Sequence, residues 1–262
     1  MKNILRQLLP FGVVESHRRR FRLQRLGIRS KHYSSSELVQ ALDVCRFDLW
    51  PPELRQSPQN WVLVDVGANV GEYAAAVLKL ASPQRVIAIE PLPSCHSKLA
   101  SVLAGNRNSL LIKAAVGESS GEIEIYSTSN SKMSSILPAQ PEIADSYQPG
   151  DFAIQQKLKV PLVRIDDVVP ANTPIGILKL DVQGFELSAL RGAEATLQHT
   201  KAVQVEINYT PHYSGGASFD ELHGFLAARG FQLFGVSAPY AGHDGPLWAD
   251  AVYSKREYIS HL

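Results

Sequence analysis

Two glycines and an acid in the segment VDVGANVGEY, residues 64–73, have the spacing of a ligand-binding turn. Asp65 ends an apolar run, while Gly67 and Gly71 occupy the turn and the head of the following helical pattern. Glycine lets the backbone approach a ligand closely, and a helix N-terminus offers N–H groups and a positive dipole end. The D-x-G-x-x-x-G spacing differs from the G-x-G-x-x-G that cradles a pyrophosphate. It therefore favours a smaller anion, such as an amino-acid carboxylate.

Glu90 carries the second chemical signal. It ends the next apolar run, 23 positions after Gly67, and Pro91 follows it. An acid about 20 residues beyond a glycine turn commonly accepts hydrogen bonds from both hydroxyls of a ribose. A ligand with a ribose and a small zwitterion, but no pyrophosphate, matches S-adenosylmethionine. The alternative is an NAD- or nucleotide-binding oxidoreductase, and the missing third glycine counts against it.

Four carboxylates are expected along one edge of a sheet, because Asp65, Glu90, Asp181 and Glu206 each end an apolar run. Ligands of an open parallel sheet gather outside the carboxyl ends of its strands. Methyl transfer is an in-line displacement, so the enzyme must orient the acceptor and exclude water. A base beside the acceptor hydroxyl helps to remove its proton. The candidate catalytic residues are Asp181, Glu206, His212 and Lys179.

Each of these candidates has an alternative interpretation. Asp181 alternatively caps the helix that follows it, and His212 alternatively lies on the surface of a loop. Lys179 either contacts substrate or pairs with an acid. Asp181, Glu206 and Asn208 also carry oxygens of the kind that Mg²⁺ prefers. Their spacing does not establish a divalent-metal site, so the metal requirement stays open.

Apolar runs that alternate with helical patterns are expected to position these residues. A continuous apolar run that ends in an acid is typical of a buried parallel strand. The alternation predicts an α/β fold: a Rossmann-like, mostly parallel sheet of about seven strands with helices on both faces. The last two strands are expected to pair antiparallel. The main strands are predicted at 61–66, 85–90, 110–117, 175–181, 202–208, 231–237 and 247–254.

Helices are predicted between these runs. One helix begins after Asp181, and another begins at a capping box formed by Ser218 and Glu221 and ends at Gly230. Leu38, Val39 and Leu42 predict a further helix after three serines. The remaining predicted helices span 71–80 and 94–103.

The alternation breaks after residue 120. Residues 121–127 alternate isoleucine with glutamate, which predicts a half-exposed antiparallel strand. Residues 127–156 are polar and lack periodicity, and they are too long for an ordinary connection. They are interpreted as a functional lid or a disordered loop that helps to shape the acceptor pocket. Residues 158–169 return to a strand.

Seven segments resemble, in order, the FkbM-type S-adenosylmethionine-dependent methyltransferases. The resemblance covers about residues 60–210, and K-x-D-x-x-G-x-E followed by L-x-G-A is its most specific part. The family more often has glutamate where this chain has Gln183, so a strictly required acid there is not expected. The segments are VDVGANVGEY, VIAIEPLPSCHSKL, KAAVGESSGEIEIY, MSSIL, VRIDDV, ILKLDVQGFELSALRGAEATL and VQVEINY.

This resemblance implies a seven-stranded class I methyltransferase fold and methylation of a hydroxyl group, on a sugar of a glycan or on a natural product. A non-catalytic partner that keeps the cofactor fold and binds glycan or a lipid carrier is a further alternative. The resemblance places Ala115 and Val116 near the adenine. The candidate cofactor-binding residues are Asp65, Gly67, Ala68, Asn69, Gly71, Glu90, Pro91, Ala115 and Val116.

Charge is distributed unevenly along the 262 residues. Residues 1–32 hold nine Lys and Arg against Glu15, a net charge of +8, and the remaining residues carry −7, which together give +1. The near-neutral total argues against a dedicated nucleic-acid binder. Residues 1–58 are interpreted as a basic helical extension, and residues 59–262 as the methyltransferase domain.

The basic residues 1–32 have two interpretations. With leucines at helical spacing, they could contact an anionic membrane surface, or pack on the acidic body or a second copy of the chain. Cys45 and Cys95 have no metal-ligand spacing and are expected in the core of a protein from a reducing compartment. With no apolar run long enough to span a bilayer, the prediction is a cytoplasmic protein that either stays free or binds a membrane peripherally.

Overall fold

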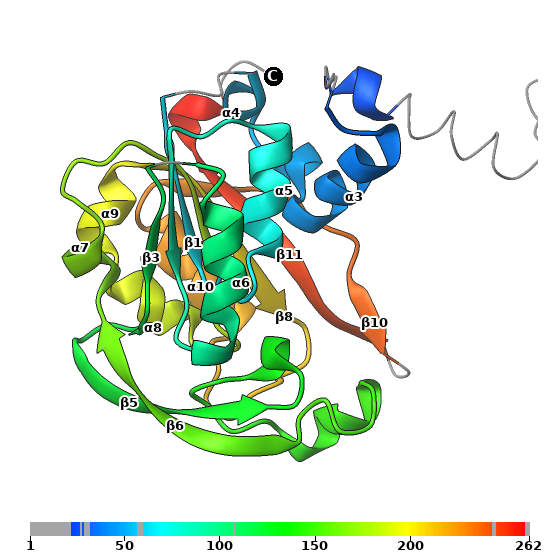
Figure 1. Cartoon of the computed structure of the whole chain (residues 1–262), viewed down its shortest axis with the longest axis vertical. Coiled ribbons are helices and arrows are strands. Elements are labelled where there is room, and N and C mark those ends of the chain that lie inside the picture. Colours follow the sequence, from blue (N-terminus) through cyan, green and yellow to red (C-terminus); the bar gives the residue numbers. More distant parts are fainter. Residues whose placement is uncertain are drawn as a thin grey trace, which may run out of the picture.

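A large twisted sheet forms the centre of the molecule (Figure 1). The computed structural model describes residues 22–26, 28, 32–56, 60–106, 108–242 and 245–259. Most of the basic segment 1–32 and the domain boundary predicted at residues 58 and 59 lie outside these ranges. The membrane, intramolecular and homodimer contacts of that segment therefore stay predictions.

The described part of the main sheet has eight strands in the order β10-β11-β8-β7-β1-β2-β3, with β9 paired to β11. The strands β3, β2, β1, β7 and β8 are parallel to one another, and β11 runs antiparallel to β8, β9 and β10. The predicted mostly parallel α/β class and the final antiparallel pair are confirmed. The strands are β1 (Val62–Val66), β2 (Arg85–Ile89), β3 (Leu110–Ile112), β7 (Ile175–Leu180), β8 (Thr200–Asn208), β9 (Phe231–Val236), β10 (Tyr240–Gly242) and β11 (Gly245–Lys255).

Helices cover both faces of this sheet. Buried side chains of α3 (Ser35–Cys45), α5 (Glu72–Leu80) and α6 (Pro93–Leu103) share one apolar core with the sheet. Those of α7 (Ile165–Val168), α8 (Glu186–Arg191), α9 (Glu194–Gln198) and α10 (Phe219–Ala227) share the core on the other face. β1 and β7 are buried along their whole length, as continuous apolar runs between two helical layers must be.

Local sequence signals explain where these helices begin and end. Capping boxes formed by Ser34 with Glu37 and by Ser218 with Glu221 open α3 and α10, which confirms both predicted starts. The single helix expected after Asp181 is instead divided into α8 and α9 at Gly192. A Cβ atom at Gly192 would lie 2.0 Å from the carbonyl oxygen of Gly117, so the chain approaches a neighbouring loop too closely for a side chain.

A second, smaller sheet corrects the prediction of one strand over 110–117. Only Leu110–Ile112 joins the main sheet, whereas β4 (Ala115–Val116) pairs with β6 (Ile154–Val163), which in turn pairs with β5 (Gly121–Thr128). In Figure 1 the long curved strands β5 and β6 cross the lower end of the molecule. The connection between them holds the short 3-10 helices η2 (Ser131–Met133) and η3 (Pro141–Ser146).

The described residues before the family-like region belong to the core rather than to a separate layer. The indole of Trp50 follows the 3-10 helix η1 (Phe47–Leu49), is fully buried, and donates to the carbonyl of Cys45 at 3.1 Å. Cys45 and Cys95 are free and buried, as predicted. The short α4 (Pro52–Gln56) completes this region. Among the described residues, no helix has the length and hydropathy needed to span a membrane.

Gly176→Ala is expected to lower the free energy of unfolding by about 1–3 kcal/mol, because an added methyl group overpacks the core. Its Cβ would lie 2.3 Å from Cδ2 of Trp61, and this buried ring packs against Trp50 with centroids 6.0 Å apart. Urea unfolding measures the change. Gly224→Ala is the control: it lies in α10 with open space around its Cβ, so it should stabilise by about 0.5–1 kcal/mol. Equal urea midpoints of unfolding for the two variants would contradict the close packing of Gly176 against the ring of Trp61.

Candidate functional site

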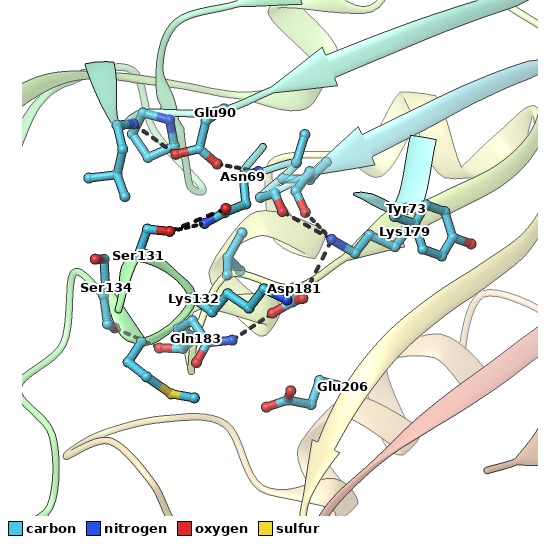
Figure 2. Close-up of a pocket in the computed structure, with 18 of the residues that line it drawn as sticks. Asn69, Tyr73, Glu90, Ser131, Lys132, Ser134, Lys179, Asp181, Gln183 and Glu206 are labelled. Atoms are coloured by element: carbon cyan, nitrogen blue, oxygen red, sulfur yellow. Dashed lines mark hydrogen bonds and ion pairs between the residues drawn. The ribbon is translucent and has the colours of Figure 1, made fainter. Parts of the chain in front are cut away.

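A cavity of about 380 Å³ lies along the ends of the parallel strands. Its volume falls in the range of small-molecule sites. Figure 2 shows Glu90 and Glu206 at opposite ends of the drawn site, with Lys179 and Asp181 between them. Every predicted site residue lines this cavity except Asp65 and Gly71. The structure therefore brings nearly all of them together.

Contrary to the prediction from the sequence, the N–H groups of the glycine turn are not free to bind a ligand anion, because they have acceptors within the protein. The N–H groups of Gly67 and Ala68 both donate to the carbonyl of Ile89, at 3.0 and 3.2 Å, and the N–H of Gly71 donates to Ala68 at 2.8 Å. The N–H of Asn69 donates to a carboxylate oxygen of Glu90, and that of Val70 donates to the Asn69 side chain. These five N–H groups are thus engaged within the protein, so the turn is rigid rather than a set of free donors.

Gly67 is required by a close approach at the base of the turn. It has φ +70°, and a Cβ there would lie 1.9 Å from the carbonyl oxygen of Asp181. The loops that follow β1 and β7 therefore touch through backbone. No side chain fits between these two loops, which explains the glycine in physical terms.

Glu90 directly follows β2, as predicted, and is 3% exposed. Its Oε2 accepts from the N–H of Asn69 at 2.7 Å, and its Oε1 accepts from the N–H of Leu92 at 2.8 Å. Burial raises the pKa of Glu90, and these two hydrogen bonds oppose the rise. Each oxygen retains a second lone pair. The carboxylate is thus held in one orientation and keeps acceptor capacity toward the cavity.

Asp65 lies behind the cavity wall rather than in it. It is fully buried one residue before the end of β1. Its charge partner is the ammonium of Lys179, 3.3 Å from Oδ1. Burial raises the pKa of Asp65, and Lys179 opposes this rise. Asp65 therefore acts on the site through Lys179.

Lys179 joins the two central strands. Its Nζ lies 3.5 Å from Oδ2 of Asp181 and donates to the carbonyl oxygens of Val66 and Gly67, at 3.5 and 3.0 Å. Burial alone would lower the pKa of Lys179, but attraction by Asp65 and Asp181 outweighs burial and raises it. The ammonium therefore stays charged, and the interpretation that Lys179 pairs with acids is confirmed.

Asp181 lines the cavity and is constrained from two sides. Besides the ion pair with Lys179, its Oδ1 accepts from Nε2 of Gln183 at 2.6 Å. The other amide atom, Oε1 of Gln183, accepts from the hydroxyl of Tyr213 at 2.7 Å. An ionised glutamate could not donate to Asp181. Gln183 therefore forms a bridge between Asp181 and Tyr213 that the glutamate more frequent in the family could not form.

The loop after β7 has its own buried anchor in Glu186. Its Oε1 accepts from the N–H groups of Val182 and Gly184, at 3.0 and 3.2 Å. Burial raises the pKa of Glu186 to about 7. Within this turn, Gln183 and Gly184 adopt left-handed backbone conformations, with φ of 55° and 95°. The acid in the predicted K-x-D-x-x-G-x-E motif thus shapes the turn that presents Asp181.

Glu206 lies within β8, two residues before its end, not at the end as predicted. It faces the cavity and stands directly across from Asp250 of β11. Burial raises the pKa of Glu206 well above that of an ordinary glutamate, and the nearby charges of Asp181, Glu186 and Asp250 add to the rise. Asp250 is itself paired with Arg46, whose Nε donates to Oδ2 at 2.7 Å.

His212 is buried rather than a surface residue of its loop. Its Nε2 lies 2.7 Å from the hydroxyl of Tyr147, and its Nδ1 has no hydrogen-bond partner. Burial lowers the pKa of His212, which favours the neutral imidazole. Tyr147 stacks on Tyr240 with ring centroids 5.8 Å apart. The histidine thus lines the cavity next to an aromatic group.

The polar segment between β5 and β6 is ordered and covers the cavity. Ser131, Ser134 and Ser135 line it, as do Lys132 and Met133. This places the predicted MSSIL serines over the site and favours the lid interpretation. Side-chain contacts hold the cover at both ends: Asn69 Nδ2 to Ser131 Oγ at 3.0 Å, Lys132 Nζ to Glu72 Oε2 at 2.8 Å, and Ser135 Oγ to the Gln183 carbonyl at 2.6 Å.

Several cavity residues carry no sequence signal for this site. Arg46, Trp248 and Asp250 come from segments far from the glycine turn, and only the fold brings them to it. Tyr147 lies in the polar segment, where nothing distinguishes it from its neighbours. In the part of the chain that the structure describes, no group of three or more His, Cys, Asp or Glu is arranged to hold a metal ion.

A mostly parallel α/β sheet with a rigid glycine turn and a carboxylate-lined cavity at the ends of its strands is the arrangement expected for an S-adenosylmethionine-dependent methyltransferase. A family model described as the methyltransferase FkbM domain matches residues 65–233, more than half of the chain. The chain belongs to the FkbM methyltransferase family. This assignment removes the oxidoreductase and non-catalytic alternatives.

Comparison with individual proteins agrees with the family. The chain is 26% identical to methyltransferase sdnD of Sordaria araneosa over 216 residues, which cover 72% of the chain and 80% of that protein. It is similar in fold to the methyltransferase FkbM of Methylobacillus flagellatus KT, with a TM-score of 0.51 and 19% identity over 88% of the chain, but it spans only 57% of that structure. A weaker likeness, with a TM-score of 0.41 and 13% identity, is to M. jannaschii TYW2 in complex with AdoMet, covering 85% of the chain and 76% of that structure.

The charges of the cavity fit S-adenosylmethionine, which carries a positive sulfonium. Glu72, Asp181 and Asp250 have ion-pair partners in Lys132, Lys179 and Arg46. Among the described lining residues, Glu90 and Glu206 have no such partner, and burial raises the pKa of both, so a cationic sulfonium bound between them would stabilise their charged forms. Glu90 would hold the ribose beside the apolar Ala115 and Val116, which line the same end. When bound there, the cofactor supplies an electrophilic methyl group.

Lys179→Met is expected to lower the free energy of unfolding by about 3–5 kcal/mol, because it leaves Asp65 charged and buried without a partner. The double variant Asp65→Asn with Lys179→Met should recover much of this loss, since the uncompensated charge is gone. Urea unfolding of both single variants and the double variant forms a thermodynamic cycle. Strictly additive losses would show that the two side chains are not coupled.

Glu90→Gln is expected to weaken binding of S-adenosylmethionine and S-adenosylhomocysteine by about tenfold to a hundredfold, because a charged acceptor of ribose hydroxyls becomes neutral. Isothermal titration calorimetry measures both affinities. Glu122→Gln is the matched control, since that glutamate pairs with Lys159 at an exposed site of the small sheet. Unchanged affinity in the Glu90 variant would remove this residue from the cofactor site.

Proposed function

We propose that this methyltransferase transfers its methyl group to a hydroxyl of a sugar, glycan or natural product. The observation that carries the proposal is the placement of Glu206 and His212 in the same cavity as Glu90. A hydroxyl must lose its proton as its oxygen attacks, so a base beside the acceptor accelerates the reaction. The raised pKa makes ionised Glu206 a stronger base than an ordinary glutamate, and the lowered pKa keeps His212 in the neutral form that can accept a proton.

The order of residues along the sheet edge supports a division of the cavity. Strands β2, β1, β7 and β8 are neighbours, and neighbouring strands lie about 4.8 Å apart. Glu90 after β2 and Glu206 in β8 are therefore separated by about 14 Å. The nucleoside binds at the Glu90 end, the reacting centre lies near Asp181, and the acceptor hydroxyl faces Glu206.

Glu206 is the preferred base among the three candidates. Asp181 is already engaged by Lys179 and Gln183, so it orients ligands in the centre of the cavity rather than accepting the proton. His212 is held by Tyr147 through Nε2, and its Nδ1 is buried, so it is less available than Glu206 to take the proton. The cover formed by residues 131–135 excludes water from the reacting atoms.

Glu206→Gln is expected to lower kcat by about 10²–10⁴-fold while S-adenosylhomocysteine still binds, because only general-base catalysis is lost. In the wild type the ionised form of Glu206 is active, so kcat/KM falls as the pH drops through its pKa. Since that pKa is raised, the fall occurs at higher pH than for an ordinary glutamate.

Release of S-adenosylhomocysteine from hydroxyl acceptors, followed between pH 5 and 9, tests this proposal. Mass spectrometry of the product identifies the methylated oxygen. A Glu206→Gln variant with wild-type turnover would exclude Glu206 as the base. Methylation of nitrogen or carbon acceptors, without any O-methyl product, would overturn the proposed function.

A further inference from the structure

We propose that Arg46, Asp250 and the stacked rings of Trp248, Tyr240 and Tyr147 form an acceptor subsite for a neutral, polyhydroxylated ring such as a pyranose. This inference rests on the proposed function and names the class of acceptor. Arg46, Trp248, Asp250 and Tyr147 line the cavity that also contains Glu206.

The position of the subsite follows from the sheet order. β11 lies next to β8, on the side away from β2, which places Asp250 about 19 Å from the end of β2. Asp250 and Glu206 occupy opposite positions on the two paired strands, and such cross-strand side chains are neighbours on one face of a sheet. A ring bound at Asp250 therefore presents one of its hydroxyls to Glu206.

Arg46 reaches this position from the end of α3. Its backbone is left-handed, with φ 51°, and ends the helix. This turn directs the side chain to β11, 204 positions later in the sequence. In Figure 1, α3 and β10 lie on the same side of the molecule. Both Arg46 and Asp250 fall outside residues 65–233, the part that the family model matches.

The pair offers the hydrogen-bonding pattern that a vicinal diol needs. Nε of Arg46 donates to Oδ2 of Asp250 at 2.7 Å, and the two side chains remain 29% and 22% exposed. The other guanidinium nitrogens can donate to a ring oxygen or hydroxyl, and the second carboxylate oxygen can accept from a hydroxyl. Adjacent hydroxyls act as donors and acceptors at once, so they match a fixed guanidinium–carboxylate pair.

The aromatic rings supply the apolar half of the subsite. Tyr240 lies between Trp248 and Tyr147, with ring centroids 5.5 and 5.8 Å away and interplanar angles of 15° and 18°. Tyr240 is 46% exposed. Because Tyr240 is covered on both faces by these stacks, the flat surface on which the apolar C–H face of a pyranose can pack belongs to the cavity-lining rings of Trp248 and Tyr147.

The charge of the cavity disfavours an anionic acceptor. Asp181, Glu206 and Asp250 line this end, and the nearby cations Lys179 and Arg46 are already paired with acids. A carboxylate or phosphate on the acceptor would meet like charge in a partly buried site. A purely apolar ring would leave Arg46 and Asp250 desolvated without new hydrogen bonds, which is costly.

Saturation-transfer NMR with the full-length protein and S-adenosylhomocysteine tests the subsite. The probes are methyl β-D-glucopyranoside, methyl α-D-mannopyranoside, the methyl glycoside of glucuronic acid, and cyclohexanol. We expect at least one neutral glycoside to bind, and glucuronide and cyclohexanol to bind at least about tenfold more weakly, the effect of one lost charged hydrogen bond. Binding of neither neutral glycoside, or tighter binding of the glucuronide or of cyclohexanol, overturns the proposal.

Arg46→Met and Asp250→Asn are expected to weaken glycoside binding by about tenfold. Arg229→Met is the matched control, because Nε of Arg229 donates to Glu194 at 2.8 Å in an exposed pair between α9 and α10. Unchanged S-adenosylhomocysteine affinity in all three variants shows that they fold. If one variant fails to fold, the other decides.

Equal glycoside affinity in the folded Arg46 or Asp250 variants and the Arg229 control would overturn the subsite. In methyl-transfer assays the same variants should raise KM more than they lower kcat, since they act on acceptor binding. Failure of the proposed function gives a different result: the glycosides bind through Arg46 and Asp250, but no O-methyl product forms.

Discussion

The buried ammonium of Lys179 is the interaction on which the site depends. It stands at the centre of the sheet, where β1 and β7 pair with Asp65 opposite Lys179. One cation neutralises Asp65 and approaches Asp181, and it also donates to the carbonyl of Val66, which ends β1, and to that of Gly67 in the turn. The loops after both strands are therefore fixed relative to each other. This fixed geometry sets the places of the glycine turn and of Asp181.

From this centre, the site extends in two directions along the sheet edge. Toward β2, the fixed turn positions Asn69, whose N–H holds Glu90 in one orientation. Toward β8 and β11, Asp181 is followed by Glu206 and Asp250, each one strand further away. Charge compensation differs along this edge, because Asp250 has Arg46 whereas Glu90 and Glu206 have no ion-pair partner among the described residues. A positively charged ligand is favoured between Glu90 and Glu206 for this reason.

Sequence alone predicts the parts of this arrangement that depend on local patterns. Buried parallel strands read as apolar runs, capping boxes mark helix starts, and the acid after β2 follows from its distance to Gly67. It does not predict that the five N–H groups of the turn are engaged, because three of them donate to Ile89 and Glu90, about 20 positions later in the chain. The pairing of buried Asp65 with Lys179 is not predicted either, because a strand pattern does not show that two residues far apart in the chain lie opposite each other on neighbouring strands. Residues 110–117 read as one strand although they divide between two sheets, because periodicity does not reveal the partner of a strand.

The cofactor and the acceptor place different physical demands on the two halves of the site, the one toward β2 and the one toward β8 and β11. An invariant cofactor requires the same turn and acid wherever it binds, and these residues lie within the segment that matches the FkbM family. An acceptor differs from one enzyme to the next, so its contacts are best carried by elements that can change without disturbing the centre. Arg46 at the end of α3 and Asp250 in the antiparallel β11 meet this condition: they reach the cavity from outside that segment and touch neither Lys179 nor the glycine turn through a hydrogen bond or ion pair within the described residues. The fold thus separates what fixes the methyl donor from what selects its acceptor.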